Sequence, residues 1–236
     1  MTRFQAVGIA LAAVIVPTAA YPAAVVLWPV DPIIASNQQS AAVWIENRGS
    51  EPVTMQVRSL GWSQANGEDS YVQQDAVVSS PPVAQVAPGA RQLVRIIRRT
   101  ADPSGEHAYR LLIDELPRPA DSVTGPTTAS LAVQMRYSIP LFTYGAGEQT
   151  QPRLSIRIEL DRSERYLEVH NSGGRHARLT DLRLVNHGQT SMLISGLAGY
   201  VLPGATKRFK LPANSPLAGS LVVGVNGADQ TLSSLT

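Results

Sequence analysis

Residues 131–141, LAVQMRYSIPL, alternate large apolar side chains with alanine, proline or polar ones. The apolar positions of this stretch are Leu131, Val133, Met135, Tyr137, Ile139 and Leu141. Side chains that repeat with a period of two line one face of an extended strand. The stretch therefore predicts a strand longer than the usual five or six residues. From the pattern alone, its apolar face serves either the domain's own core or the surface of another protein.

The same period of two runs through the chain upstream of this strand. The predicted strands are residues 25–35, 40–47, 53–62, 70–78, 91–97 and 107–116, followed by 130–142. Turns rich in Pro, Gly, Asn, Asp and Ser separate them, and this spacing predicts an immunoglobulin-like β-sandwich. Pro29 and Pro32 lie inside the first run. Because proline cannot donate to a β-ladder, we expect that strand to break there and to switch between sheets.

A second β unit is predicted after the long strand. Residues 143–152, TYGAGEQTQP, have no apolar periodicity and are interpreted as a linker. Further strands are predicted at 153–161, 165–171, 177–185, 190–195, 206–211 and 220–227. The expected organisation is an all-β chain with an N-terminal domain at 21–143, a linker at 144–152 and a C-terminal domain at 153–236.

The N-terminal residues indicate export. Arg3, an apolar run of eleven residues at 6–16 and the small residues Thr18 and Ala20 predict a signal peptide at 1–20. The run is shorter than the roughly 20 residues of a membrane span, so no stable membrane insertion is expected. A short signal followed by a chain without cysteine suggests the bacterial periplasm. The net charge of +2 gives no positive field for nucleic acid.

The common catalytic motifs are absent from the sequence. Its 4 histidines have no metal-ligand spacing, and there is no cysteine to serve as thiolate ligand or nucleophile. No glycine-rich phosphate loop or nucleophile elbow occurs. Asp114 and Glu115 are adjacent, so on a strand they point to opposite faces, which does not suit an acid–base pair. We predict a protein that is not an enzyme and uses no metal or cofactor.

Three strings of sequence, in order, resemble the periplasmic pilus (fimbrial) chaperones of the chaperone-usher pathway. They are SSPPVAQVAPGARQLVRIIRR (79–99), AYRLLIDELP (108–117) and MRYSIPLF (135–142). Residues 27–49 resemble the archaic branch of that family in particular. The resemblance implies two immunoglobulin-like domains in an L or boomerang shape with a cleft between them. It also implies no catalytic activity, and pilus subunits and an outer-membrane usher as partners.

The resemblance further implies a mechanism. These chaperones donate a strand to a subunit whose own fold lacks one, which is a form of β-augmentation. Here the donor positions are Leu131, Val133, Met135, Tyr137 and Ile139, of which Leu131 to Met135 are expected to be the most exposed.

The subunit's terminal carboxylate is usually held in this family by an Arg on the first strand and a Lys on the donor strand. The matching positions here are Pro32 and Pro140, so that pair is missing. A buried carboxylate still needs a cation. The candidates are Arg95, Arg98, Arg99 and Arg110, with Arg95 and Arg98 preferred because they flank the turn out of their strand.

Two other hypotheses remain at this stage. One is a secreted structural protein, either a pilus subunit or a two-domain adhesin. That reading requires an N-terminal donor extension, whereas strand signals begin within a few residues of the predicted cleavage site. The other is a secreted enzyme on a β scaffold, which the missing motifs disfavour. The sequence leaves open which pilus is served and whether the free protein self-associates.

Overall fold

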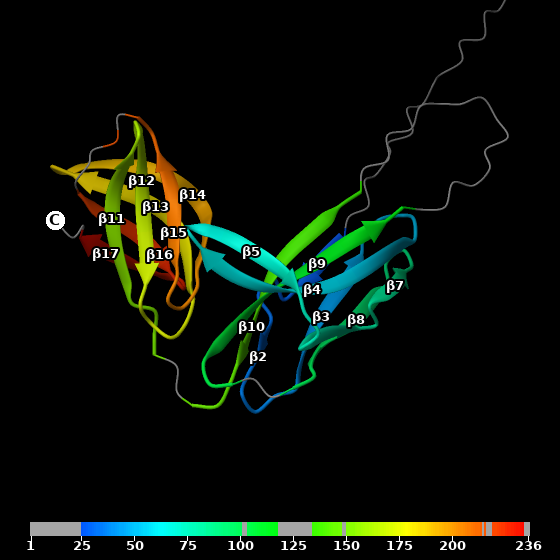
Figure 1. Ribbon diagram of the computed structural model, residues 1–236. Helices are drawn as coiled ribbons and strands as arrows, with labels where there is room; N and C mark the ends of the chain where they lie inside the picture. The colour runs from blue at the N-terminus through cyan, green and yellow to red at the C-terminus, as the bar shows by residue number, and fades with distance from the viewer. Residues whose placement is uncertain are drawn as a thin grey trace, which may run out of the picture.

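The protein folds as two β-sandwiches set at an angle to each other, as Figure 1 shows. The computed structural model describes residues 25–100, 103–117, 134–147, 150–213, 215 and 219–233. These residues form strands and turns, and they include no helix that could cross a membrane. The predicted all-β class with two immunoglobulin-like domains in an L arrangement is thereby confirmed. The predicted signal peptide lies outside the described residues.

The N-terminal sandwich contains the first ten strands. These are β1 (Val25–Trp28), β2 (Ile33–Ile34), β3 (Ser40–Asn47), β4 (Val53–Ala65), β5 (Glu68–Gln73), β6 (Val77–Ser80), β7 (Val83–Val86), β8 (Arg91–Arg98), β9 (Glu106–Leu116) and β10 (Arg136–Tyr144). One sheet has the order β1-β3-β8-β6, and the other has the order β2-β10-β9-β4-β5 with β7 also paired to β4. Alternate residues meet between the sheets, where Val43, Ile45, Leu111 and Ile113 are fully buried.

The first predicted strand breaks at its prolines, as expected. β1 pairs antiparallel with β3 in one sheet, while β2 pairs parallel with β10 in the other. Pro29 and Pro32 lie between them, and the missing N–H groups end the ladder there. The chain therefore contributes to both sheets within ten residues.

The single strand predicted at 70–78 is wrong, because β5 and β6 belong to different sheets. The side chain of Gln74 turns the chain between them. Its amide nitrogen donates to the carbonyls of Ser59 at 3.0 Å and Val77 at 2.8 Å, and its oxygen accepts the Val77 N–H at 2.8 Å. A side chain that satisfies main-chain groups in this way competes with the strand ladder.

The C-terminal sandwich contains the remaining strands. These are β11 (Leu154–Asp161), β12 (Glu164–Asn171), β13 (Ala177–Asn186), β14 (Gln189–Val201), β15 (Thr206–Leu211), β16 (Ser220–Val225) and β17 (Ala228–Ser233). They form sheets of order β11-β12-β15 and β14-β13-β16-β17. The prediction missed β17, whose side chains are mostly exposed and polar. The Asn226-Gly227 turn before it, with φ of 51° and 93°, is the hairpin signal that marks it.

Candidate functional site

One edge of β10 is open. On one side β10 pairs with β9 from Arg136 to Tyr144. On the other side, among the described residues, only β2 pairs with it, at Phe142 and Thr143. No strand in the described part of the chain therefore pairs with the stretch from Arg136 to Leu141 on that side. An open edge presents main-chain donors and acceptors to another chain.

The hydrogen bonds around β10 determine which main-chain groups face this open edge. The Phe142 N–H donates to the Pro32 carbonyl at 3.3 Å, away from β9, whereas the Met135 carbonyl accepts the Glu115 N–H on β9 at 2.9 Å. Because the directions alternate in an antiparallel pair, the even-numbered residues face outward. The open edge thus offers the N–H and C=O of Arg136 and Ser138, and the C=O of Pro140.

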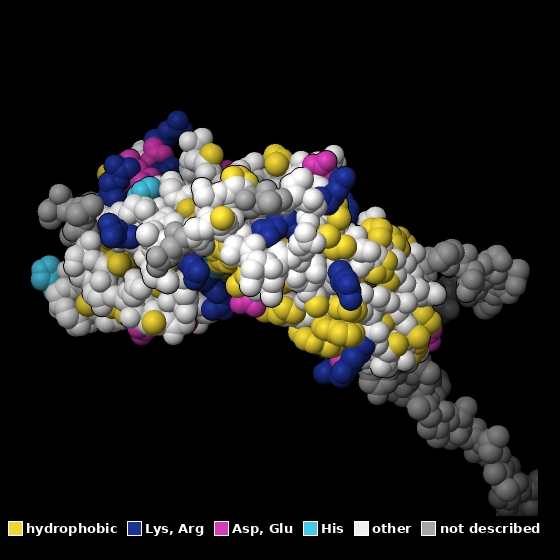
Figure 2. Space-filling view, turned by 90° about the horizontal axis from the view of Figure 1, so that it is seen from below, with side chains coloured by type: hydrophobic (Ala, Val, Ile, Leu, Met, Phe, Trp, Pro, Cys, Tyr) yellow, Lys and Arg dark blue, Asp and Glu magenta, His cyan; other side chains and the backbone are white. Residues whose placement is uncertain are grey.

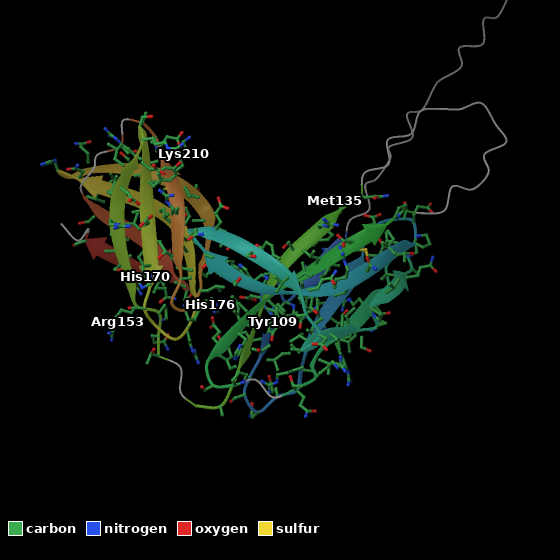
Figure 3. All side chains as sticks on the ribbon, viewed as in Figure 1. Tyr109, Met135, Arg153, His170, His176 and Lys210 are labelled. Atoms are coloured by element: carbon green, nitrogen blue, oxygen red, sulfur yellow. The ribbon has the colours of Figure 1, made fainter. Side chains whose placement is uncertain are left out.

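Side-chain burial rises along β10, so the predicted donor residues are not equivalent. Met135 is 44% exposed, while Ile139 is 8% exposed and belongs to the core of its own domain. Figure 3 places Met135 at the outer end of this domain, where β10 begins. The structure therefore does not present Ile139 to a partner, in contrast to the prediction. Leu131 and Val133 lie outside the described residues.

Tyr137 closes the gap between the two edge strands of the N-terminal sandwich. Its ring packs partly buried against the core, and its hydroxyl donates to the Val25 carbonyl on β1 at 3.4 Å. Burial and the nearby Glu115 carboxylate raise the pKa of the Tyr137 hydroxyl, so it stays a neutral donor. In this structure Tyr137 bridges β10 to β1 and does not project into solvent as a donor side chain.

An ion cluster lies on the other face of β10. Arg58 donates to Asp114 at 2.6 Å, and Arg136 donates to the second oxygen of the same carboxylate. Burial works to raise the pKa of Asp114, but the hydrogen bonds and charges of Arg136 and Arg58 outweigh it and lower the pKa. The cluster keeps one net positive charge beside the open edge.

Two of the four predicted cations are exposed on the N-terminal domain. Arg95 is exposed on the outer face of its sheet, between the buried Val94 and Ile96. Arg99 is also exposed and lies 3.7 Å from Asp75.

Arg98, one of the two preferred candidates, is buried and has a structural role. Its guanidinium donates to the carbonyls of Tyr144 at 2.9 Å, Ser36 at 3.2 Å and Gln38 at 2.5 Å. These bonds tie the loop before β3 to the end of β10. The prediction placed a subunit-binding cation at Arg98, whereas in the structure its guanidinium N–H groups donate to main-chain carbonyls of its own domain.

The fourth candidate, Arg110, lies where the two domains meet. It pairs with Pro140 across the β9–β10 ladder. Its guanidinium carbon lies 4.0 Å from the centre of the Trp62 ring, with the Tyr71 ring at 5.8 Å and the Tyr200 ring at 5.9 Å. Its Nε is buried and has no hydrogen-bond partner among the described residues. Aromatic rings from both domains therefore surround this cation.

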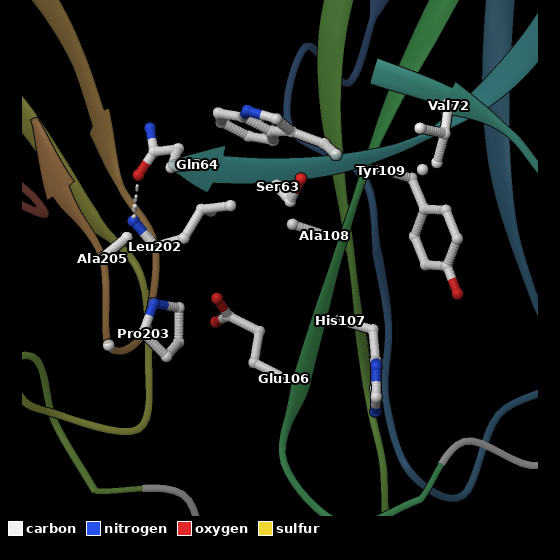
Figure 4. Close-up of a pocket in the computed structure, with 13 residues that line it drawn as sticks. Ser63, Gln64, Val72, Glu106, His107, Ala108, Tyr109, Leu202, Pro203 and Ala205 are labelled. Atoms are coloured by element: carbon white, nitrogen blue, oxygen red, sulfur yellow. Dashed lines mark hydrogen bonds between the residues drawn. The ribbon is translucent and has the colours of Figure 1, made fainter. Parts of the chain in front are cut away.

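Two hollows lie at this junction. One cavity of about 460 Å³ is shown in Figure 4, between residues 61–64 of β4, the start of β9 and residues 202–205 of the C-terminal domain. A second, of about 240 Å³, is lined by Ile33, Phe142, His176, Arg178 and Tyr200, among others. In Figure 2, apolar side chains gather on the half of the molecule that holds the N-terminal domain, with Lys and Arg between them.

A buried hydrogen-bonded pair of side chains also joins the domains. The Glu106 carboxylate, on β9, accepts the main-chain N–H of His176 at 2.9 Å and contacts its ring Nδ1 at 2.8 Å. The His176 ring stacks on Phe142 with the ring centres 3.5 Å apart, and Figure 3 shows it between the domains. Burial and the Glu106 carboxylate raise the pKa of the neighbouring Tyr144. Nothing in the sequence pattern marked these residues, because their partners come from the other domain.

Two immunoglobulin-like sandwiches at an angle, with an open edge on the N-terminal one and a cation at their junction, define a class of proteins that bind a partner through a strand edge. The chain belongs to the family of pili and flagellar-assembly chaperones, since the model of the PapD N-terminal domain matches residues 24–146. No curated protein sequence matches the chain significantly.

Solved structures of chaperones share the fold over most of the chain. One is from the CsuC–CsuE chaperone–tip adhesion subunit pre-assembly complex of the archaic chaperone-usher Csu pili of Acinetobacter baumannii. It is 28% identical, covers 89% of this chain and 97% of that chain, and has a TM-score of 0.71. The CupB2 chaperone of Pseudomonas aeruginosa is 18% identical, with coverages of 89% and 100% and a TM-score of 0.60. The Salmonella enterica structure of SafA pilin with the SafB chaperone is 17% identical. It covers 92% of this chain and 99% of that chain, with a TM-score of 0.63.

Proposed function

We propose that this pilus chaperone holds pilus subunits in the bacterial periplasm by donor-strand complementation and delivers them to an outer-membrane usher. The observation that carries the proposal is the open edge of β10, with its outward N–H and C=O groups. Chaperone–subunit complexes among the similar solved structures support it. The resemblance to the family suggests no catalytic activity, and the described residues contain no cluster of potential metal ligands.

We assign the donor side chains to Leu131, Val133 and Met135. In the sequence they continue the apolar alternation of Tyr137 and Ile139 toward the N-terminus, and those two side chains pack on their own domain. Each aliphatic side chain fully buried in a subunit contributes roughly 1.5 to 3 kcal/mol, and ordering costs subtract from the sum. Three such side chains, with main-chain pairing beside them, give a stable complex that a better-fitting strand can still replace.

We assign the carboxylate anchor to Arg110. It lies directly opposite Pro140 on the neighbouring strand, and Pro140 occupies one of the two positions at which the family usually carries a cation. The aromatic rings beside Arg110 and the burial of its Nε lower the local dielectric, which strengthens a charged hydrogen bond from its guanidinium to a carboxylate. Arg98 is less suited to this role because three carbonyls already accept from its guanidinium.

Co-purification with a pilus subunit tests this function. The variant Val133→Asp/Met135→Asp places two charges in the apolar row, and we expect recovery of the subunit to fall at least tenfold, on the order of the desolvation cost of a charge. The matched control is Met192→Asp/Leu197→Asp, because these two apolar side chains of β14 are 56% and 54% exposed. Equal recovery with both variants would refute the donor assignment. Failure of the wild type to recover any subunit would favour the structural-protein hypothesis.

A further inference from the structure

Residues 62–69 of β4 and β5 extend beyond the N-terminal sandwich as a two-stranded hairpin, which we call the interdomain hairpin. Asn66 and Gly67 form its turn, with φ of 55° and 83°, as two-residue hairpin loops require. In Figure 1 this hairpin, drawn in cyan, reaches the C-terminal domain. Trp62 packs there with Tyr200 and Leu202 of that domain.

Gln64 forms the first hydrogen-bonded link of the interdomain hairpin to the C-terminal domain. Its side-chain nitrogen donates to the Tyr200 carbonyl at 2.8 Å, and its side-chain oxygen accepts the Leu202 N–H at 2.9 Å, the bond drawn in Figure 4. An amide side chain that satisfies both groups of a strand end acts as a neighbouring peptide would.

The tip of the interdomain hairpin forms a second link. Gly67 makes a parallel bridge to Lys207, and its carbonyl accepts the Arg208 N–H at 3.4 Å. A Cβ atom on Gly67 would lie 2.5 Å from the Arg208 Cγ, so the close approach needs glycine.

Asp69 couples the two links. It accepts from Lys207 at 2.9 Å across the domain boundary, and from Gln64 at 2.7 Å and Trp62 at 3.1 Å within the hairpin. The carboxylate thus holds Gln64 in the orientation that pairs with β14. Burial alone would raise the pKa of Asp69, but these hydrogen bonds keep it below its ordinary value.

We propose that the interdomain hairpin fixes the angle between the two domains, so that the cleft between them, which holds Arg110 and the cavity of Figure 4, is already formed before a partner arrives. Domains joined by one linker usually move relative to each other unless a specific interface prevents it. Here the two domains are connected by a main-chain hydrogen bond at Gly67 and by the hydrogen bonds of the Gln64 side chain to main-chain groups. Such hydrogen bonds form only over a small range of distances and angles, so they resist rotation of one domain against the other. If only part of the protein had the domain angle that binds a partner, the apparent affinity for that partner would fall by the same fraction. A preformed cleft avoids this loss.

Distance measurements between the domains test this inference without any subunit. The chain has no cysteine, so Gln85→Cys and Thr190→Cys, both at exposed sites, introduce one spin label in each domain. We expect a single narrow distance distribution. The variant Gln64→Ala/Asp69→Ala should broaden it, since each lost hydrogen bond shifts the equilibrium roughly two- to tenfold. The control Glu68→Ala removes the adjacent, exposed carboxylate and should leave the distribution narrow.

A second variant protects the test against simple unfolding. Gly67→Val keeps every polar group and acts through the clash with Arg208 and the backbone strain at φ of 83°, so it should broaden the same distribution while circular dichroism stays that of a folded protein. A distribution that stays narrow in either folded variant, or is already broad in the wild type, would overturn the inference. Because no subunit takes part, these outcomes are independent of the proposed chaperone function.

Discussion

Replacing Arg98 by methionine should destabilise the protein strongly without acting on the binding site. Methionine keeps an apolar stem of similar length but removes the donors to the carbonyls of Tyr144, Ser36 and Gln38. Hydrogen bonds from charged groups contribute roughly 1.5 to 3 kcal/mol each, and water replaces part of that loss, so we expect about 3 to 5 kcal/mol. This corresponds to a Tm lower by roughly 10 °C, measured by calorimetry.

Arg110→Met should give the opposite pattern. The cation over the Trp62 ring contributes about 0.5 to 2 kcal/mol, so the Tm falls by only a few degrees. Loss of the carboxylate's partner should weaken subunit binding by roughly thirtyfold or more, measured by titration with a purified subunit. Arg95→Met is the control, because Arg95 is exposed on the outer face of its sheet. The assignment of roles would be refuted if Arg98→Met kept its Tm but no longer bound the subunit, while Arg110→Met bound the subunit as tightly as the wild type.

Three further outcomes follow from the structure. Glu106→Ala leaves the main-chain N–H and the ring of His176 without their buried acceptor and should lower the free energy of unfolding by roughly 1 to 3 kcal/mol in urea titrations; an unchanged value would contradict a role for the pair in joining the domains. Asp69 and Asp114 each have a lowered pKa in the folded protein, so each carboxylate stabilises the fold fully when the pH is above the ordinary pKa of 3.8. This stabilisation is lost as the pH falls through the lower pKa of the folded state. The contribution of these carboxylates to the Tm should therefore be constant from pH 7 to 5, and the Tm should fall below about pH 4. The fall should be smaller in Asp69→Asn, and an equal fall in that variant would count against a stabilising role for the Asp69 carboxylate. Gly227 lies in the β16–β17 turn with φ of 93°, so Gly227→Val should lower the free energy of unfolding by about 1 to 3 kcal/mol. A variant that melts at the same temperature as the wild type would contradict this.

Local pattern was sufficient to predict most strands of the N-terminal domain, but it missed β7 (Val83–Val86). The period of two identified its core, and Pro29 and Pro32 correctly predicted the break between β1 and β2. The split of residues 70–78 was missed because it depends on Gln74, whose side chain bonds main-chain groups that only the folded chain brings near. β17 was missed because its exposed, polar side chains carry no apolar period.

The candidate site could be predicted only in outline. The alternation of β10 continues without interruption where its side chains change from exposed to buried, so the sequence could not separate Met135 from Ile139. Arg98 looked like a free cation because its carbonyl partners lie 46 to 62 residues away in the sequence. Arg110 became distinct only once Tyr200, from the other domain, was placed beside it.

Amide hydrogen exchange in β10, followed by NMR with and without a bound pilus subunit, tests the central claim most directly. The N–H groups of Arg136 and Ser138 face the open edge, so they should exchange fast in the free protein and become protected in the complex. The N–H groups of Tyr137 and Ile139 point to β9 and should be protected in both states. Exchange at Arg136 and Ser138 that does not change when the subunit binds would contradict strand donation by this edge.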